Sequence, residues 1–550
     1  MTLACMGGAM LLTGCNNSGK QTMETTDPTG WSFSGLAASS VVPTQTPEKT
    51  NNIYWGDVHN HNNVTYGHGD LKDALDAAKQ HIDFVAPTPH ALWPDIPGEN
   101  DERLSWVIAY HTGAFKRLRQ GGWEKYVDMT NSYNEEGKFL TFLSYECHSM
   151  EHGDHVALFY DQNPPLVECT SVPDLKAKLK GMKAFVTPHH MGYITGYRGY
   201  NWDYFQQDEQ TPFVEMYSRH GLAESDLADY PYLHDMGPRI YEGTIQYGLE
   251  KGYKFGIIGS TDQHAGYPGS YGDGRMAAVA PSLTRDAIWN AMEKRHVYGA
   301  TGDKIKIDFR INDALMGEEI NGNSRKIYVN VEGENYIDYV DIVKNGKSIA
   351  RLNGPHSLAV PAQETVHAKV KVEFGWNRSE EPIRWDGNLK ISEGKILSVT
   401  PCFRGAAFTS PQEGVHVFKT LVNKVVSRDD QKVNLEMYTT KNPNTTTPAT
   451  QAVILEVEMP KNATITADFN GKQFSHSLEE LLQGTQAHFM IGWLSEAIQF
   501  HRAALPAAYT VERTMIDNTP EKDTDYYYVR VRQRDNQWAW SSPIWVNNVR

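Results

Sequence analysis

The sequence predicts an α/β protein in which a parallel α/β barrel is followed by a mostly antiparallel, β-sandwich-like second half. A chain of 550 residues is too long for one compact core, so at least two domains are expected. From Ile53 to Ser260, short β-rich apolar segments alternate with helical stretches, which is typical of repeated βα units around a parallel sheet. From Lys304 the apolar residues recur with period two, which indicates half-buried antiparallel strands.

The N-terminal segment, residues 1–15, reads MTLACMGGAMLLTGC and ends in Leu12, Thr13, Gly14 and Cys15. It resembles a bacterial lipoprotein signal, in which Cys15 becomes the acylated first residue of the mature chain. An ordinary cleaved secretory signal is the alternative, and both predict export. A lipid anchor on Cys15 would be the sole membrane contact of a protein in the bacterial periplasm or at the outer-membrane or cell surface. Residues 16–50 contain seven Thr, five Ser and three Pro and are expected to be a flexible linker.

Residues 51–303 carry the alternating pattern and are assigned to the barrel. The first strand is NIYWGDVH, and the first helix follows in DLKDALDAAKQ, where Asp70 is the expected N-cap. Leu71, Ala74, Leu75 and Ala78 stand at i, i+3, i+4 and i+7 and give this helix one apolar face. A long helical region is expected around residues 101–135. The later strands are IDFVAPTP, FLTFLSYE, HVALFY, AFVTP, FVEMYS and FGIIGS.

Residues 304–550 are predicted to form a β-rich accessory domain. Its first strand alternates Ile305, Ile307 and Phe309 with polar residues. Two Asn-Gly pairs, at 345–346 and 470–471, lie between β-prone segments and are the expected turns of β-hairpins. The C-terminal segment YYYVRVRQRDNQWAWSSPIWV is expected to form two aromatic-rich strands around a polar turn.

Charge balance and cysteine content limit the possible functions. Lys and Arg total 52 against 67 Asp and Glu, a net charge of −15, which disfavours bulk binding of nucleic acid. Mean hydropathy is −0.53, and after the N-terminal segment no apolar run approaches the roughly 20 residues of a membrane-spanning helix. Once Cys5 and Cys15 are set aside, Cys147, Cys169 and Cys402 remain, which are too few for a disulfide framework.

Fifteen of the 21 histidines fall between His59 and His296, and several stand at the ends of predicted strands. In a parallel barrel, the carboxyl ends of the strands carry the active site. Residues i and i+2 of a strand point to the same face, so His59 and His61 are able to bind one ion. The other candidates at strand ends are His90, Glu146, His155, His189, His190, Asp262 and His264.

This mixture of imidazoles and carboxylates, without thiolates, suits Zn²⁺, Mn²⁺ or Fe²⁺. The donors are too many for a single ion, so a cluster of divalent transition metals is predicted. Glu146 is the natural bridging ligand because its carboxylate has two oxygens and can share its charge between two cations.

The order of these residues resembles the successive motifs of the polymerase and histidinol phosphatase (PHP) superfamily. The shared features are HNH at 59–61, the strand-end His90, Glu146 followed by His155, His189, and the DxH pattern at 262–264. More narrowly, GDVHNH, YGHGDLKDAL, YSRHG and STDQHAGYPGSYGDGR resemble a bacterial PHP-like family of unknown function (DUF3604) over about residues 53–302, and the closing AWSSPIW also fits it. The resemblance implies a distorted (β/α)7 TIM-like PHP barrel, two or three metals, and hydrolysis of phosphoesters.

The resemblance also implies how the ligands are divided. His59, His61, Glu146 and Asp262 would hold the first metal, Glu146, His155 and His189 the second, and His90 and His264 a third. The chain departs from the superfamily pattern at two places. It has Thr88, Pro89 and His90 where TDH is usual, and it lacks a clear counterpart of the aspartate that usually follows HxH, for which His68 or Asp70 could substitute.

A water between two cations would be the nucleophile, so no Ser or Cys nucleophile is required. The third metal, or an imidazole such as His190 or His220, would stabilise or protonate the leaving oxygen. Arg198, Arg219 and Arg275 follow predicted strands and could bind the oxygens of phosphate, sulfate or carboxylate. A surface salt bridge is the alternative for each arginine.

The leading hypothesis is an exported metal-dependent hydrolase, in particular a phosphoesterase with a small-molecule or glycan-derived ester as substrate. Two alternatives stay open. The same cluster could cleave a carboxylic ester, lactone, amide or sulfate ester, because a metal hydroxide attacks any of these bonds. Alternatively the barrel is non-catalytic and the chain is a glycan-binding surface lipoprotein, a hypothesis motivated by Pro89 and the missing aspartate.

Overall fold

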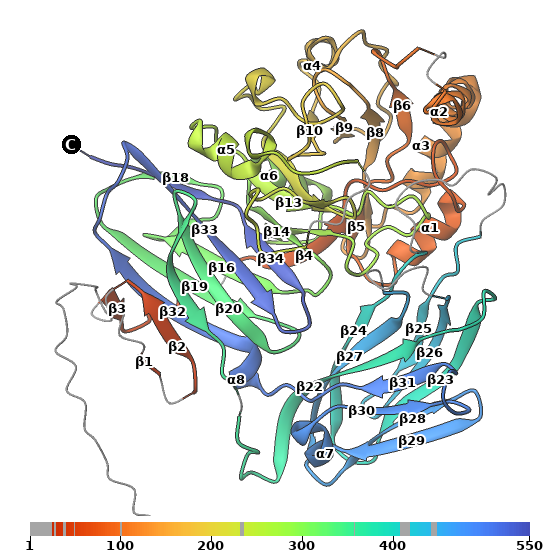
Figure 1. The fold of residues 1–550 in the computed structure, drawn as a ribbon, viewed down its shortest axis with the longest axis vertical. Coiled ribbons are helices and arrows are strands. Elements are labelled where there is room, and N and C mark those ends of the chain that lie inside the picture. Colours follow the sequence, from red (N-terminus) through yellow and green to blue (C-terminus); the bar gives the residue numbers. More distant parts are fainter. Residues whose placement is uncertain are drawn as a thin grey trace, which may run out of the picture.

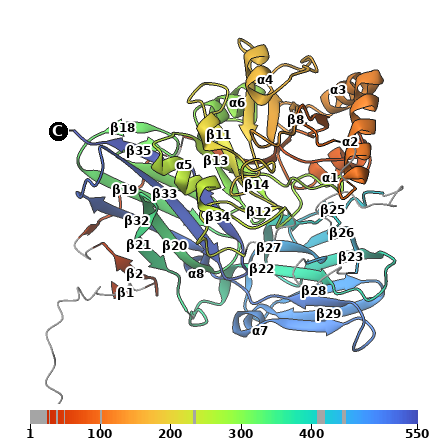
Figure 2. The same ribbon diagram turned by 45° about the horizontal axis from the view of Figure 1, so that its top comes forward.

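The computed structural model describes residues 25–26, 29–36, 40–48, 50–98, 102–231, 236–356, 358–406, 419–441 and 448–549. An α/β region lies at the top of Figure 1, and two groups of β-strands lie beneath it, an arrangement that Figure 2 shows from a second direction. The predicted lipoprotein signal, residues 1–15 with Cys15, lies outside the described residues. Among the helices that the structure describes, none combines the length and the apolar character needed to cross a membrane.

The α/β region consists of short strands and helices in alternation. Its strands are β4 (Asn52–Asp57), β5 (Phe84–Val85), β6 (His90–Leu92), β7 (Leu140–Thr141), β8 (Leu143–Cys147), β9 (His155–Phe159), β10 (Ala184–Pro188), β11 (Phe213–Ser218), β12 (Gly221–Leu222), β13 (Gly256–Gly259), β14 (Arg275–Ala280) and β15 (Val297–Ala300). Its helices are α1 (Leu71–Ala78), α2 (Ser105–Arg117), α3 (Trp123–Ser132), α4 (Val172–Leu179), α5 (Ile245–Glu250) and α6 (Arg285–Glu293). The predicted apolar face of α1 is confirmed, because Leu71, Ala74, Leu75 and Ala78 are all buried.

The strands of this region pair in both directions. β4, β5 and β7 are parallel, as are β6 with β8 and β11 with β13. In contrast, β9 is antiparallel to β8 and β10, and β14 is antiparallel to β4 and β15. The loop between Cys147 and His155 is too short for the crossover that a parallel connection requires. The hydrogen bonds of the described strands divide the region over three sheets, and closure into a barrel is not detected, so the prediction of a uniformly parallel barrel is only partly right.

The described strands after residue 304 are mainly antiparallel, as predicted. One group comprises β16 (Lys306–Ile311), β17 (Ala314–Leu315), β18 (Glu319–Asn321), β19 (Arg325–Glu332), β20 (Ile337–Lys344), β21 (Lys347–Asn353), β32 (Thr510–Asp517), β33 (Thr524–Gln533), β34 (Trp538–Ser541) and β35 (Ile544–Asn547), with the short helix α8 (Pro506–Tyr509). β34 pairs with β15, so the sheet of the α/β region continues into this group. The expected hairpin at Asn345-Gly346 joins β20 to β21, with both residues at positive φ.

The second group forms two five-stranded sheets that share an apolar core. It comprises β22 (Thr365–Gly375), β23 (Ile383–Ile391), β24 (Lys395–Cys402), β25 (Lys424–Arg428), β26 (Lys432–Thr439), β27 (Gln451–Pro460), β28 (Thr464–Phe469), β29 (Lys472–Ser477), α7 (Leu478–Gln483), β30 (Gln486–Phe489) and β31 (Ala497–Phe500). Phe374 and Leu455 from one sheet meet Trp385 and Phe469 from the other in this core. The expected hairpin at Asn470-Gly471 joins β28 to β29.

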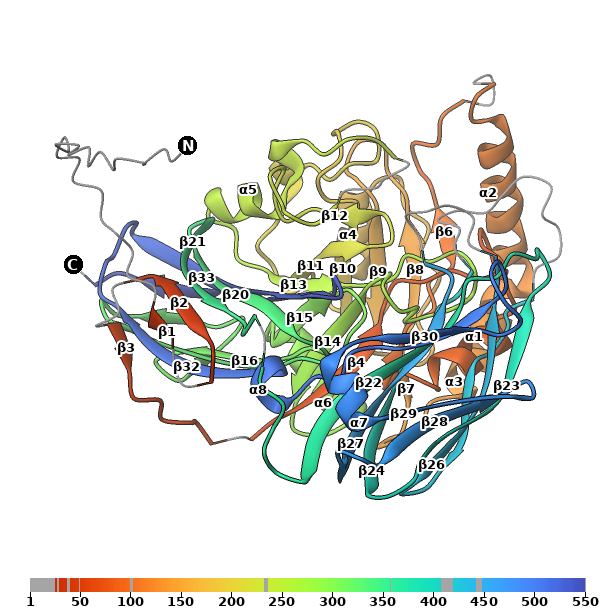
Figure 3. The ribbon, with the colours of Figure 1, turned by 60° about the horizontal axis from the view of Figure 1, so that its bottom comes forward.

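The prediction of a flexible linker over residues 16–50 is wrong for the part that the structure describes. β1 (Thr25–Thr26) pairs with β2 (Ser32–Gly35), which pairs with β21, and β3 (Val41–Val42) pairs with β32 (Figure 3). Trp31 and Phe33 are buried, at 3% and 6% exposure. These two apolar side chains and the backbone hydrogen bonds of β2 fix a segment that its composition alone suggested would be flexible.

A buried carboxyl near the junction of the three parts predicts a pH-dependent stability. Asp303 is 1% exposed and accepts hydrogen bonds from Tyr271 Oη at 2.7 Å and Gln533 Nε2 at 2.6 Å. Burial raises its pKa to about 7 from the ordinary 3.8. The folded protein therefore retains a proton that the unfolded chain releases, and stability falls as the pH rises from about 4 to about 7.

We expect Asp303→Asn to remove this pH dependence. As the pH rises from 5 to 8, the free energy of unfolding of the variant should increase by on the order of 2 kcal/mol relative to that of the native protein. Urea unfolding of both proteins at the two pH values measures the difference. Parallel pH profiles for the two proteins would contradict the expectation.

Candidate metal centre

Buried imidazoles and carboxylates from separate strands meet at one place in the α/β region. They lie at or next to the ends of β4, β6, β8, β10, β11 and β13, where side chains are no longer committed to packing between strands and helices. The predicted residues that the structure brings together are His59, His61, His90, Glu146, His189, His190, His220, Asp262 and His264, all of them buried.

Glu146 lies at the centre of this cluster. Its Oε2 atom is 3.0 Å from His90 Nε2 and 3.5 Å from His61 Nε2. Its Oε1 atom is 3.0 Å from His189 Nε2 and 3.2 Å from His148 Nδ1. Both oxygens of one carboxylate therefore face imidazoles on different strands and loops.

Asp262 is the second carboxylate of the cluster. Its Oδ1 atom is 2.9 Å from His61 Nε2, and its Oδ2 atom is 3.1 Å from His190 Nε2 and 3.2 Å from His220 Nε2. Asp262 and His190 both have positive φ, at 46° and 54°. Residues other than glycine seldom adopt this left-handed conformation, and such strain gathers at functional sites.

The ring orientations of His59 and His61 are fixed by hydrogen bonds at their Nδ1 atoms. His59 Nδ1 is 2.9 Å from Glu215 Oε2, and His61 Nδ1 is 2.7 Å from the carbonyl oxygen of Thr88. These contacts direct the two Nε2 atoms toward each other, 3.2 Å apart, and toward Asp262. A histidine that donates Nδ1–H to an oxygen and presents Nε2 has the usual arrangement of a metal ligand.

Charge states in the cluster also favour metal binding. Burial by itself would raise the pKa of Glu146, but the surrounding His148, His90 and His189 outweigh it and hold that pKa well below its ordinary value. Burial lowers the pKa of His90 well below its ordinary value and that of His189 to about 3. Ionised carboxylates and neutral imidazoles are the forms that bind metals.

His59 and His190 are the exceptions among these imidazoles. Burial alone would lower both pKa values, but the carboxylates of Asp262 and Glu215 hold the pKa of His59 well above its ordinary value. Hydrogen bonds with Asp154 and Asp262 likewise outweigh burial at His190 and raise its pKa to about 9. Its Nδ1 atom is 3.0 Å from Asp154 Oδ2, and its Nε2 atom faces Asp262. His190 therefore holds two protons at neutral pH between two carboxylates.

Four functional candidates were absent from the sequence-based set: His111, His148, Asp154 and Glu215. His148 follows Glu146 at i+2, so the period of a strand could have identified it. Asp154 Oδ2 lies 2.9 Å from His148 Nδ1 and 2.8 Å from Arg198 Nε, and it also meets His190. His111 comes from the middle of α2, where no motif marks it.

Several imidazoles of the cluster have nitrogens with no hydrogen-bond partner in the part of the chain that the structure describes. They include His90 Nδ1, His111 Nε2, His148 Nε2 and His189 Nδ1, and all are buried. Since buried polar atoms are normally satisfied, a site that leaves several lone pairs together has the donor chemistry of a metal site.

The cluster contains several overlapping groups whose ligand atoms lie within 4.8 Å of one another. They include His61 with His90 and His264; His90 with His111 and His148; His59 with His189 and Asp262; His59 with His61 and Glu146; and Asp154 with His189 and His190. The protein therefore has multiple buried histidine-rich groups capable of binding metal ions.

One predicted ligand is not brought into the cluster. His155 begins β9, its Nδ1 atom is 2.9 Å from the carbonyl oxygen of Gly153, and its ring packs against Tyr200. Neither a hydrogen bond nor an ion pair joins it to Glu146 or His189, both of which are described. Because β9 runs antiparallel to β8, its first residue is aligned with Cys147, and the neighbouring His148 and Asp154 contact the cluster instead.

The predicted arginines have three different environments. Arg198 lies at the cluster, where it donates to Asp154. Arg275 is fully buried and donates to the carbonyl oxygens of Gly269 and Gly302, so it supports a loop and does not face a substrate, contrary to the prediction. Arg219 pairs with Asp273 at 2.5 Å on the wall of another pocket.

The two proposed substitutes for the missing aspartate also differ. His68 is buried and its backbone N–H donates to the carbonyl oxygen of His264 at 2.7 Å, which places it beside the cluster. Asp70 is exposed and accepts from Asn63 Nδ2 at 2.5 Å. Only His68 is therefore close enough to support the cluster.

Asp154 contacts three side chains of the cluster, His148, His190 and Arg198. Because it lies in a loop, its replacement should impair function without disturbing the strands. We expect Asp154→Asn to lower the hydrolytic activity that the sequence predicts by about 10- to 100-fold, because the contacts to His148, His190 and Arg198 are lost or reversed. Steady-state rates of the metal-loaded variant measure the loss.

Asp95→Asn is the matched control, because Asp95 accepts from Ser149 and Met150 in the same loop without a contact to Glu146 or Asp262. Equal activities of the two variants would rule out a specific role for Asp154.

Comparison with known proteins gives distant matches. No family model matches the chain. An uncharacterized protein of Chlamydia pneumoniae is 24% identical over 304 residues, which cover 48% of this chain and 49% of that protein. Uncharacterized proteins of Chlamydia muridarum and Chlamydia trachomatis are 23% and 22% identical, cover 48% and 54% of this chain, and are themselves covered to 49% and 48%. The chain thus spans about half the length of the curated relatives it matches.

Among solved structures, a two-domain protein of Bacteroides vulgatus that contains a predicted PHP-like metal-dependent phosphoesterase covers 79% of this chain and is itself covered to 97%. The sequence identity is 14% and the TM-score is 0.28. Neither comparison is close enough to assign a family, and membership of DUF3604 stays a prediction.

Proposed function

We propose that the protein is a metal-dependent hydrolase whose substrates are phosphoesters. The observation that carries this proposal is the position of Glu146, whose two oxygens each lie 3.0 Å from the Nε2 atom of a different histidine, His90 and His189. A carboxylate presented in this way, with imidazoles at both oxygens, is suited to bridge two cations.

The donors present fit such a centre, because they are buried, because burial keeps His90 and His189 neutral, and because several imidazole nitrogens lack hydrogen-bond partners among the described residues. We assign His59, His61, Glu146 and Asp262 to the first metal, Glu146, His189 and Asp154 to the second, and His90 and His264 to a third. His148 and His111 complete the surroundings of His90. Bound Zn²⁺, Mn²⁺ or Fe²⁺ would activate a water and neutralise the charge of the substrate.

The chain's own residues supply proton transfer and substrate binding in this proposal. His190, protonated between Asp154 and Asp262, is placed to donate a proton to a leaving oxygen, and His220 occupies the other side of Asp262. Arg198 keeps part of its side chain exposed, at 20%, so its guanidinium is able to bind a phosphoryl oxygen.

The proposal also covers the type of fold, the location of the protein and its substrate. The α/β region would be a distorted (β/α)7 barrel of the PHP type, and the later sheets a β-sandwich-like accessory domain. The protein would be exported as a periplasmic or surface lipoprotein, with a small-molecule or glycan-derived ester as substrate. The motifs that resemble the PHP-like family and the N-terminal segment support these points.

A matched substrate panel tests the reaction class. The purified protein loaded with Mn²⁺ or Zn²⁺ is assayed with p-nitrophenyl phosphate, bis-p-nitrophenyl phosphate, p-nitrophenyl acetate and p-nitrophenyl sulfate. We expect turnover of a phosphate ester that chelation abolishes and metal restores. Faster turnover of acetate or sulfate would favour the other hydrolase class, and absence of all turnover in fully metal-loaded protein would favour the non-catalytic alternative.

A further inference from the structure

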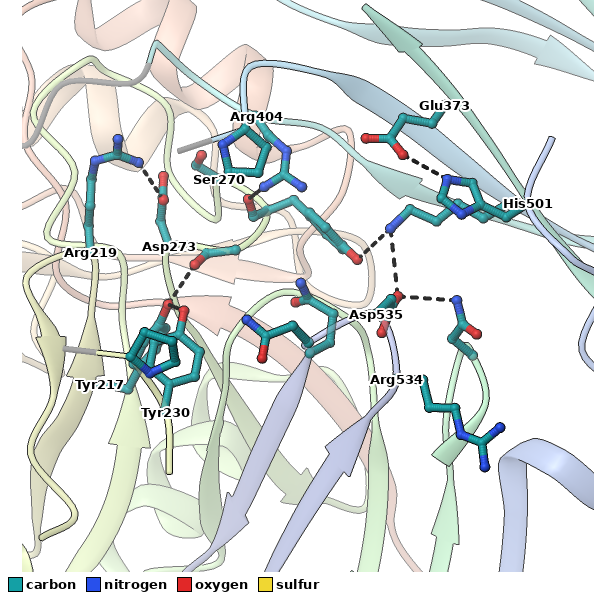
Figure 4. A pocket seen from close by; sticks show the side chains of 18 of the residues that line it. Tyr217, Arg219, Tyr230, Ser270, Asp273, Glu373, Arg404, His501, Arg534 and Asp535 are labelled. Atoms are coloured by element: carbon teal, nitrogen blue, oxygen red, sulfur yellow. Dashed lines mark hydrogen bonds and ion pairs between the residues drawn. The ribbon is translucent and has the colours of Figure 1, made fainter. Parts of the chain in front are cut away.

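A cavity separate from the metal cluster lies where the α/β region meets both β-strand groups. Its volume is about 720 Å³, which is the size of a site for a small organic ligand. Figure 4 shows its walls: Tyr217 and Arg219 come from β11 and the loop after it, Arg404 and His501 come from the second strand group, and Asp535 comes from the turn after β33. Throughout this subsection it is called the junction pocket.

The junction pocket carries an excess of positive charge. Its lining includes five Arg and Lys side chains but three carboxylates, although the chain as a whole has a net charge of −15. Each carboxylate already has a partner: Asp273 pairs with Arg219 at 2.5 Å, Asp535 with Lys371 at 3.7 Å, and Glu373 with His501 at 2.7 Å. The remaining cations of the lining are arginines whose charge no carboxylate of this pocket balances.

Arg404 and Arg502 show how these guanidiniums are held. Arg404 donates through Nη1 to the carbonyl oxygen of Tyr271 at 2.5 Å and lies 4.6 Å above the Tyr271 ring. Arg502 donates through Nε to the carbonyl oxygen of Leu482 at 3.0 Å. Among the described residues, neither forms an ion pair with a carboxylate. Each is thus positioned by neutral groups and retains donors for a further partner.

Arg219 provides an independent indication of a missing partner. Its side chain is 8% exposed, and its Nε atom is buried without a hydrogen-bond partner in the described part of the chain. Leaving a charged donor unsatisfied in a protein interior is costly, so a site of this kind usually has an acceptor that binds to it.

We propose that the junction pocket binds a small molecule bearing an oxyanion, namely a phosphate, sulfate or carboxylate group, through Arg219, Arg404 and Arg502. The planar fork of donors in each guanidinium matches the geometry of such groups. This site is distinct from the metal cluster. Arg219 faces the pocket, while the next residue, His220, has its Nε2 atom 3.2 Å from Asp262 on the cluster side.

Calorimetric titration of the full chain, stripped of metal by chelation, tests this proposal. The probes are glucose 6-phosphate, glucose 6-sulfate, glucuronate and, as the uncharged reference, glucose, all at one ionic strength. We expect at least one anionic probe to bind with a stoichiometry of one while glucose does not. Arg404→Gln and Arg502→Gln should each weaken that binding by about tenfold or more, because each removes a charged hydrogen bond.

Arg384→Gln is the control, because Arg384 is an exposed arginine that pairs with Glu436 on β26, outside the junction pocket. The metal content of the pocket variants after reloading should equal that of the native protein, which separates this proposal from the metal-dependent function. Absence of binding by all three anionic probes, or binding that both pocket variants leave unchanged, would overturn it.

Discussion

Replacing Glu146 with Gln should weaken metal binding and reduce the proposed phosphoesterase activity by about a thousandfold or more, because each metal of the proposed centre would be worth several kcal/mol to the reaction. The side chain keeps its size, but it loses the charge that the surrounding His90 and His189 face at 3.0 Å. Elemental analysis of the purified variant and steady-state rates on p-nitrophenyl phosphate check the two parts of this expectation.

Glu334→Gln is the matched control for this experiment. Glu334 is also a buried glutamate, at 7% exposure, but it pairs with Lys369 in the β-rich part of the chain. It should retain metal and activity even if its stability falls. A Glu146→Gln protein with full metal content and full activity would exclude Glu146 as a bridging ligand.

Asp262→Asn should have the next largest effect, a loss of activity of about 100- to 1,000-fold. This carboxylate meets His61 on one oxygen, at 2.9 Å, and both His190 and His220 on the other. The substitution therefore weakens metal binding and also lowers the pKa of His190, because one of the two anions that stabilise its proton is gone. The alkaline limb of the pH–rate profile should move to lower pH.

Asp341→Asn serves as the control for Asp262, since Asp341 is equally buried but pairs with Arg351 and Arg530. If Asp262→Asn leaves both the rate and the pH profile within twofold of the native values, the assignment of Asp262 to the centre is wrong.

The sequence located most of the cluster because its members stand at strand ends. His59, His61, Glu146, His189 and Asp262 each follow an apolar segment, and strand ends gather at one edge of a sheet even where closure into a barrel is not detected. The prediction that these residues lie close together therefore holds, although several strands that were expected to be parallel are antiparallel. Their roles as ligands stay predictions.

Other members of the site could not be found in this way. His111 lies on a helix face, and Asp154 lies in a loop whose path depends on how β8 and β9 pair. The same pairing explains why His155 lies outside the cluster, since a strand-end position predicts a neighbour only if the strand direction is known. Arg275 also lies elsewhere: its charge suggested contact with a ligand, whereas three hydrogen bonds to carbonyl oxygens satisfy its guanidinium within the protein.

The fold shows a similar division between local and long-range information. The Asn-Gly turns at 345–346 and 470–471 are local signals, and both hairpins are present. The docking of β2 onto β21 joins residues more than 300 positions apart and leaves no periodic pattern in the Thr- and Ser-rich segment. The continuation of the central sheet through β15 into β34 is likewise a long-range pairing that no local motif indicates.

Anomalous diffraction from crystals soaked in Mn²⁺ tests the central claim most directly. We predict two or more anomalous peaks inside the cluster, at least one of them shared between Glu146 and the Nε2 atoms of His59 and His61, and another beside His189. A map from fully soaked crystals with no peak in contact with Glu146 or Asp262, or with manganese bound solely at other places on the chain, would contradict the account.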